Sequence, residues 1–406
     1  MIHGLHSASY ALRLLVLPVD AHHNAFVAQY AARMARNLAL GGDSVYLAIT
    51  PGGWCTPFER DEPMQFVAWL APNTDANQSD SRRFQRARSE AAEATRALVR
   101  AVQPECVLFV SAYAGHGAAM LEGVAASGVP SAVVVLDAHS PHAALDGRPL
   151  FLRRQAFAQQ WVVTSAQAQR VLARRLDCAP HALEVCPEGV PLHPHAAPTN
   201  RAAHRKEVRA ALGLPDDAVL VVSHGPMDED SGCIDWAEAI VRIAESHPMA
   251  YFFWVGAGNL AATVRTTVAG TPAERALRIL REGDLNLDID LAADLAVFPA
   301  RAPRPGLAVG RAMAAGIPLI ATAVDPVPEV VRPMREGIVC GKANPQSLGD
   351  ALQYALANPA VLHAMAEAAY LRIQDFSDER AIHSLRPVLE RISVLRGAVR
   401  SPGERR

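Results

Sequence analysis

The sequence predicts an α/β protein made of two doubly wound, Rossmann-like domains. Short apolar strands alternate with helical segments, glycine-bearing turns follow several strands, and this rhythm occurs in two separate stretches of the chain. A length of 406 residues allows two cores of ordinary size. Alternation of this kind indicates a parallel sheet with helices on both faces.

The first stretch supplies the expected N-terminal domain, residues 1–195. Its strands are apolar runs bounded by polar residues or glycine, which is the pattern of buried parallel strands. The expected elements are strands at 12–19, 45–49, 106–110, 131–136 and 161–164, and a helix at 26–40 that ends at two glycines. Helical segments separate the later strands, so the sheet is expected to be doubly wound.

The second stretch supplies a domain expected at residues 203–376. The polar, proline-bearing segment 191–207 ahead of it predicts a linker. The expected elements are strands at 218–223, 251–255, 277–280, 295–298 and 317–322, one long helix at 347–373 and a last helix at 378–395. We expect the segment 377–395 to pack back on the N-terminal domain, and 396–406 to form a polar tail.

Charge and composition exclude several classes of protein. The formal net charge is −2, which gives no reason to expect a nucleic-acid partner. No run of 18 apolar residues is present, so no transmembrane segment is expected, while contact with a membrane surface stays open. The N-terminus lacks the pattern of a secretory signal, and the six cysteines are scattered without metal-type spacing. These features predict a cytoplasmic protein with reduced thiols and no metal site.

Five motifs cover much of the chain. They are VDAHHNAFVAQYAARMARNLALGGDSV (19–45), LEVCPEGVPL (183–192), VVSHGPMDEDSGCIDWAEAIVRI (221–243), HPMAYFFWVGAGN (247–259) and ADLAVFPARAPRPGLAVGRAMAAGIPLIATAVDPVPEVV (293–331). Together they resemble the GT-B glycosyltransferases, and family 4 of that group in particular. The resemblance implies two domains facing a central cleft, with the acceptor on the first domain and the donor on the second.

The same resemblance implies an activity. Its members transfer a sugar from a nucleotide-sugar donor to a glycan or protein acceptor, in polysaccharide or glycoconjugate biosynthesis. The resemblance further implies a retaining reaction that needs neither a metal ion nor a bound cofactor. Fold alone does not establish this chemistry, so it is an expectation about the site.

The sequence departs from the family pattern at the donor site. Pro303 and Arg311 stand where the family has its two acidic residues, and Pro226 and Ser231 stand where it has an arginine and a lysine. Proline supplies neither charge nor a donor, and a guanidinium cannot accept hydrogen bonds from ribose hydroxyls. Two functions therefore stay open: a glycosyltransferase with a diverged donor site, and a catalytically inactive pseudo-glycosyltransferase that acts as partner or scaffold of another glycosyltransferase.

Candidate donor-binding residues lie where the strands of the second domain end. A helix that begins near Gly306 offers backbone amides to a phosphate, and two arginines precede it. The candidates are Gly225, His224, Arg301, Arg304, the amides of Gly306, Leu307 and Ala308, and Glu329. For each charged candidate a structural interpretation also stays open: solvated loop arginines, a core or turn histidine, and an acid at a helix N-terminus.

Candidate catalytic residues lie in the first domain. His139 and Asp137 follow the strand 131–136, and an imidazole suits acid–base or hydrogen-bonding work there, although a histidine that caps the next segment is the alternative. His22 and His23 occupy a loop that is glycine-rich in the family, so they indicate a changed site or none. The segment VGAGNLA (255–261) fits the dinucleotide fingerprint, but it follows a second strand and predicts a tight turn instead.

Overall fold

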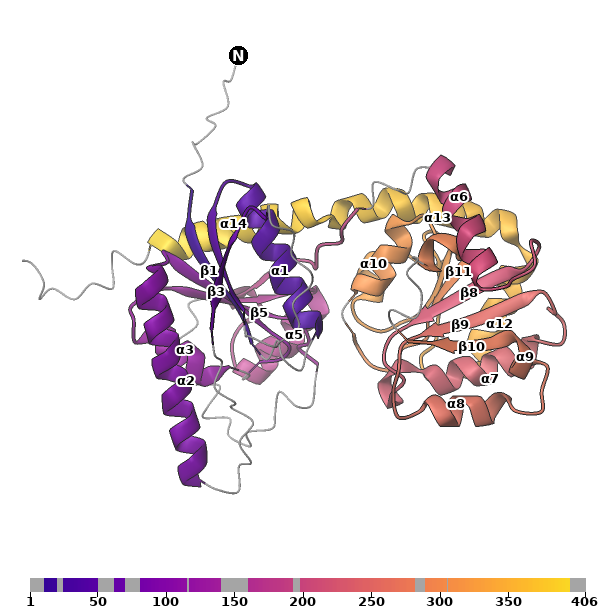
Figure 1. The fold of residues 1–406 in the computed structure, drawn as a ribbon, viewed down its shortest axis with the longest axis horizontal. Coiled ribbons are helices and arrows are strands. Elements are labelled where there is room, and N and C mark those ends of the chain that lie inside the picture. The colour runs from indigo at the N-terminus through magenta and orange to yellow at the C-terminus, as the bar shows by residue number, and fades with distance from the viewer. Residues whose placement is uncertain are drawn as a thin grey trace, which may run out of the picture. The chain divides into compact units, whose positions relative to one another are not determined.

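The computed structural model divides the chain into two compact units. It describes residues 11–19, 25–49, 62–69, 81–114, 117–139, 160–192, 198–281, 289–304 and 306–394. Unit 1 consists of Met1–Pro187 with Glu379–Arg406, and unit 2 consists of Glu188–Asp378 (Figure 1). The first unit is therefore completed by the C-terminal end of the chain.

Unit 1 contains a seven-stranded parallel sheet with the order β3-β2-β1-β4-β5-β6-β7. Its strands are β1 (Arg13–Pro18), β2 (Ser44–Ile49), β3 (Gln65–Ala68), β4 (Cys106–Ser111), β5 (Ser131–Val135), β6 (Gln160–Val163) and β7 (Leu183–Val185). Its helices are α1 (Ala25–Leu40), α2 (Ser81–Val102), α3 (Ala118–Ala125), α5 (Ala166–Leu176), η2 (Pro180–Ala182) and α14 (Asp378–Val394). The order reverses direction at β1 and β4, as in a doubly wound fold.

Alternation along each strand buries both faces of this sheet. In β1, Leu14 and Val16 join the core beneath α1 and α14, whereas Leu15 and Leu17 join the core beneath α2, α3 and α5. Helices α2 and α3 lie side by side (Figure 1). The near-continuous apolar runs of the sequence follow from this two-sided burial.

Helix α14 packs on unit 1 through apolar side chains and one buried ion pair. Its residues Ile382, Leu385, Val388, Leu389 and Ile392 belong to the core shared with α1. Nη2 of Arg386 lies 3.1 Å from Oδ1 of Asp43, whose side chain is 1% exposed. The same oxygen accepts a hydrogen bond from the Leu12 amide at 3.0 Å. The last helix is therefore an integral part of unit 1.

Replacing Asp43 by asparagine should change how stability depends on pH. Burial raises the pKa of Asp43, while the Leu12 amide and Arg386 oppose the rise and Glu390 and Glu105 add to it. A raised folded-state pKa contributes stability that is complete below about pH 4 and is lost as the pH rises through the folded pKa. The free energy of unfolding of Asp43→Asn minus that of the wild type should therefore increase from about pH 4 to 7 in urea unfolding. A difference that stays constant or decreases over this range would contradict this.

Unit 2 contains a six-stranded parallel sheet with the order β10-β9-β8-β11-β12-β13. Its strands are β8 (Val219–His224), β9 (Ala250–Val255), β10 (Leu277–Leu280), β11 (Leu295–Phe298), β12 (Leu319–Thr322) and β13 (Ile338–Cys340). Its helices are α6 (Pro198–Ala211), η4 (Glu229–Ser231), α7 (Cys233–Ile243), α8 (Ala261–Val268), α9 (Ala273–Ala276), η5 (Ile289–Ala292), α10 (Leu307–Ala314), α11 (Val327–Val330), α12 (Pro345–Ala357), α13 (Pro359–Ile373) and η6 (Gln374–Phe376).

Both faces of the unit 2 sheet are also covered. Helices α7, α8 and α12 pack on one face and α6 and α10 on the other (Figure 1), while α13 contributes side chains to both cores. On the first face Trp236 is fully buried and meets Trp254 edge to face, with ring centroids 5.5 Å apart. The two doubly wound units agree with the predicted fold class.

The predicted linker is partly wrong, because α6 begins at Pro198. Val208 of this helix is buried, and Nη2 of Arg209 lies 2.6 Å from Oδ2 of Asp294 just ahead of β11. Arg205 donates to the Ala292 carbonyl at 3.0 Å. Polar composition suggested a loop, but contacts distant in sequence anchor these arginines on the sheet.

The predicted long helix at 347–373 is also wrong, because it is two helices. Helix α12 ends before Asn358, whose φ of −129° and ψ of 59° are not helical, and Pro359 begins α13. Proline disfavours the helical conformation of the residue before it and suits the first turn of a helix. The sequence analysis also missed the edge strands β3 and β13.

Candidate functional site

The carboxyl ends of the unit 2 strands are closely packed by glycines. A Cβ on Gly256 would lie 2.0 Å from the Gly225 carbonyl oxygen, and one on Gly258 would lie 2.3 Å from that of Met227. The loops after β8 and β9 therefore touch through their backbones. The segment 255–261 makes the tight turn that the sequence predicts.

His224 is oriented by a carboxylate at the end of β8. Its Nε2 lies 2.5 Å from Oδ1 of Asp290 in η5, and both side chains are 23% exposed. The ring is thus fixed at the edge of the sheet and still reaches solvent. The following residue, Gly225, has φ +124°, a conformation that favours glycine.

Arg301 is held by a buried carboxylate. Its Nε and Nη2 donate to the two oxygens of Asp235 in the first turn of α7, each at 2.6 Å. The Asp235 side chain is 4% exposed, and the hydrogen bonds that Arg301 donates to it raise the pKa of Arg301. The guanidinium thus neutralises an acid of the protein itself.

Arg304 is paired with a more accessible acid. Its Nη2 donates to Oδ1 of Asp228, and its backbone amide donates to the Asp325 carbonyl at 3.3 Å. The side chains of Arg304 and Asp228 are 29% and 42% exposed. Both sequence-predicted arginines therefore lie at the carboxyl edge, and each has an acidic partner that sequence reasoning did not identify.

Helix α10 begins beside these arginines. Gly306 is its N-cap, and Leu307 and Ala308 form its first turn. A Cβ on Gly306 would lie 2.8 Å from Cγ of Pro326, so the loop after β12 closes on this end of the helix. The first-turn amides point out of the helix N-terminus, as in any helix.

The four substituted positions take other roles in the structure. The Ser231 hydroxyl donates to the Asp228 carbonyl at 2.7 Å and its side chain closes the loop around η4. Pro226 and Arg311 are exposed, and Pro303 is half-buried. The loop after β8 is therefore stabilised by its own polar groups where the family has cations.

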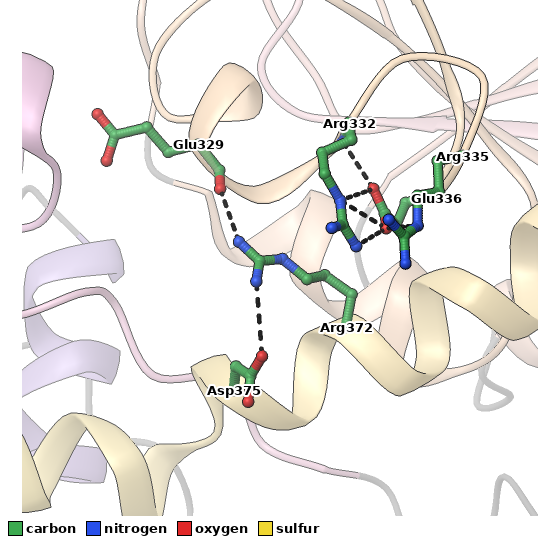
Figure 2. A network of polar contacts seen from close by, with 6 residues as sticks. All are labelled: Glu329, Arg332, Arg335, Glu336, Arg372 and Asp375. Atoms are coloured by element: carbon green, nitrogen blue, oxygen red, sulfur yellow. Dashed lines mark hydrogen bonds and ion pairs between the residues drawn. The ribbon is translucent and has the colours of Figure 1, made fainter.

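Glu329 lies at the edge of a separate polar network (Figure 2). Its carbonyl oxygen accepts from Nη2 of Arg372 at 3.3 Å, and its carboxylate points away from Arg372. Nearby, Arg332 and Arg335 pair with Glu336, whose side chain is fully buried. Burial alone would raise the pKa of Glu336, but the hydrogen bonds from Arg332 outweigh it and the pKa is lowered.

In unit 1, Asp137 and His139 form a turn after β5. The carboxylate of Asp137 accepts from the His139 amide at 2.9 Å, and the His139 carbonyl accepts from Nη2 of Arg175 at 2.9 Å. Both residues are half-buried at the carboxyl end of the unit 1 sheet. His22 and His23 lie outside the described residues.

The partners Asp228, Asp235 and Asp290 were missed by the sequence analysis. Asp228 had a local signal, since it begins an Asp-Glu-Asp-Ser turn and caps η4. Asp235 and Asp290 are each 66 residues from the side chain that they bind, a separation at which no sequence spacing indicates contact.

The helices and the cysteines of the described part of the chain can be compared with what the sequence predicts. No helix there is long and apolar enough to cross a membrane. Cys106, Cys186, Cys233 and Cys340 are buried free thiols, whereas Cys178 is exposed. Burial raises the pKa of Cys106 and of Cys186 to about 12, so these thiols stay protonated at neutral pH.

Comparisons with known proteins agree with this architecture. Residues 204–372 match the family model described as glycosyl transferases group 1. A glycosyltransferase structure from Rickettsia africae superposes with a TM-score of 0.77 at 13% identity, covering 94% of this chain and 99% of that one. An Anabaena protein solved with UDP and glucose gives 0.72 at 14% identity, covering 94% and 99%.

Two curated relatives are similar in sequence, and both are named D-inositol 3-phosphate glycosyltransferase. The protein from Corynebacterium aurimucosum is 27% identical over 58% of this chain and 59% of its own length. The one from Saccharomonospora viridis is 26% identical over 60% and 58%. The matched region spans about three fifths of these relatives. Residues 204–372 are thus similar to the glycosyl transferases group 1, and the chain has the two-unit GT-B fold of these glycosyltransferase structures.

Proposed function

We propose that the chain is a glycosyltransferase that takes its sugar from a nucleotide-sugar bound by unit 2. Ligands of doubly wound folds bind beyond the carboxyl ends of the strands. The similarity of residues 204–372 to the glycosyl transferases group 1 and the printed names of the relatives support a sugar-transfer reaction. We further propose that the reaction retains anomeric configuration and uses no metal ion or cofactor.

The observation that carries this proposal is the glycine packing at the carboxyl edge. Three glycines there leave no room for a side chain, because Cβ atoms on Gly232, Gly256 and Gly258 would lie 1.8, 2.0 and 2.3 Å from backbone oxygens. The loops after β8, β9 and β11 are therefore packed backbone against backbone, which fixes the carboxyl edge at which a phosphate or ribose would bind.

Several groups of unit 2 would supply the polar contacts to the donor. The amides of Gly306, Leu307 and Ala308 would donate to a phosphate, Arg304 would add positive charge, and the ring of His224 would make a further polar contact. Gly225 would let the ligand approach β8, and Glu329 would contact the sugar. Arg301 would contribute positive charge to the donor site while it stays paired with Asp235. On the acceptor side, we propose His139 as the acid–base group, with Asp137 setting its turn.

The first experiment is calorimetric titration of the full chain with UDP, GDP, ADP, TDP and their common sugars. One nucleotide should bind with an affinity of about micromolar, and Arg304→Ala should weaken it by about ten-fold. The matched control is Arg265→Ala, which removes an exposed arginine from α8 and should change nothing. Equal affinities of the wild type and Arg304→Ala would contradict the role of Arg304.

Transfer itself needs an acceptor. D-inositol 3-phosphate is the first to test, because both relatives are named for it. Product formation that persists in a metal chelator and keeps the anomeric configuration by NMR would support the full proposal. Loss of activity in the chelator would contradict metal independence alone.

A second candidate is a non-catalytic partner or scaffold of another glycosyltransferase. The pairing of Arg301 with Asp235 and of Arg304 with Asp228 favours it, because both cations are already neutralised at this edge. Each missing contact to a diphosphate costs a few kcal/mol of transition-state stabilisation. A folded chain that binds no nucleotide in the panel would support this candidate, and turnover would exclude it.

A further inference from the structure

The two arginines ahead of α10 are held in different ways. Arg301 makes a bidentate pair with Asp235, an acid whose side chain is 4% exposed. If Arg301 moved away, the buried Asp235 carboxylate would have no charged partner, which is energetically costly. Arg304 bonds through one nitrogen to Asp228, whose side chain is 42% exposed. Water and ions can therefore reach the second pair, and another anion can exchange with its carboxylate.

The Asp228 carboxylate has the surroundings of a bound anion. Its Oδ1 accepts from Nη2 of Arg304, from the Ser231 amide at 2.9 Å and from the Asp230 amide at 3.1 Å. A guanidinium with two backbone amides is a donor set that phosphate oxygens also favour. The Asp228 carboxylate thus occupies, beside Arg304, a position in which a phosphate group could accept the same hydrogen bonds.

Asp228 does not use the full donor capacity of Arg304. Nε of Arg304 is buried and has no hydrogen-bond partner among the described residues. A guanidinium carries five N–H donors and is best satisfied by two oxygens in a bidentate arrangement. A phosphate group offers more acceptor oxygens than the single carboxylate oxygen that now binds Arg304.

We infer that Asp228 is a built-in competitor for the anion-binding side chain of Arg304. The inference rests on the proposed function in placing a diphosphate at this edge, and it adds regulation of that site. A nucleoside diphosphate group or free pyrophosphate must displace Asp228 before it can bind Arg304. The exposed acids Glu229 and Asp230 beside Asp228 add general repulsion, which the test must separate from direct competition.

The test uses Asp228→Asn in the full chain, with inorganic pyrophosphate as the probe. Asparagine keeps a capping oxygen for the amides of η4 but carries no charge, so the loop stays folded. Calorimetry should show that pyrophosphate binds about five-fold more tightly to this variant than to the wild type. Asp228→Ser, which also preserves a capping oxygen, should give the same gain.

Two controls assign the gain to Arg304. Glu229→Gln removes the same charge one residue away and should give a much smaller gain. In an Arg304→Gln background, Asp228→Asn should give no more than the small gain of Glu229→Gln, since the competed group is absent. A gain in the wild-type background that equals that of Glu229→Gln, or a full gain that persists without Arg304, would overturn the inference.

The same set of proteins separates this inference from the proposed function. No binding of pyrophosphate to any variant, or no gain in Asp228→Asn, overturns the competition even where the wild type transfers sugar. A gain that depends on Arg304 supports the competition even where no acceptor yields product. In the latter case the absence of turnover counts against the transferase alone.

Discussion

Replacing Gly232 by alanine is expected to lower the free energy of unfolding of unit 2 by about 3 kcal/mol or more. Gly232 precedes α7 with φ +72°, in the left-handed region. A Cβ there would lie 1.8 Å from the Pro299 carbonyl oxygen, so the loops after β8 and β11 would have to separate. Because the same loops carry Asp228 and Arg304, nucleotide binding should weaken together with stability.

Gly270→Ala is the matched control for this prediction. Gly270 also has φ +72°, but no atom lies within 4 Å of an added Cβ. Its cost should be only the left-handed backbone term, about 1 kcal/mol. Urea unfolding of the full chain, with hydrogen exchange of β8 and β11 to locate the change, compares the two variants. Equal losses of stability in Gly232→Ala and Gly270→Ala would show that the loops after β8 and β11 can separate without an energetic cost.

Removing the guanidinium of Arg301 is expected to be the second most costly change. Arg301→Ala leaves the Asp235 carboxylate buried without its partner, and this should destabilise unit 2 by about 3 kcal/mol. Hydrogen exchange should show the loss first in α7 and in the loop after β11. The physical reason is desolvation of an uncompensated charge rather than loss of an exposed ion pair.

Arg304→Ala and a double variant serve as controls for Arg301. The pair of Arg304 with Asp228 is partly exposed, so its removal should cost about 0.5 kcal/mol. Arg301→Ala combined with Asp235→Asn should recover much of the lost stability, because no buried charge remains. An Arg301→Ala variant as stable as Arg304→Ala would show that water reaches Asp235.

Elements whose signal is local were predicted well from the sequence. Strands β10 and β11 have the predicted bounds, because each is a short, mostly apolar run with charged residues or a proline close to its ends. Edge strands β3 and β13 were missed, since they are short and their pairing partners define them. Helix α6 was taken for a linker because its stabilising partner, Asp294, is distant in sequence.

In the candidate site, too, residues with a local sequence signal could be predicted and residues defined by distant contacts could not. The glycines and arginines at the carboxyl edge could be found, because strand ends and helix starts indicate where a ligand would bind. The acids that pair with the arginines could not, since Asp235 and Asp228 precede them by 66 and 76 residues. Contacts between residues distant in sequence decide whether a guanidinium is available to a ligand or is already paired with a carboxylate of the protein.

The division of unit 1 between both ends of the chain also has a consequence during synthesis. Unit 2 is one continuous segment, Glu188–Asp378, and leaves the ribosome before α14 does. The core beneath α1 lacks Leu385 and Leu389 until that last helix has emerged. The apolar face of the nascent N-terminal part therefore stays incompletely covered until α14 has been synthesised, after the whole of unit 2.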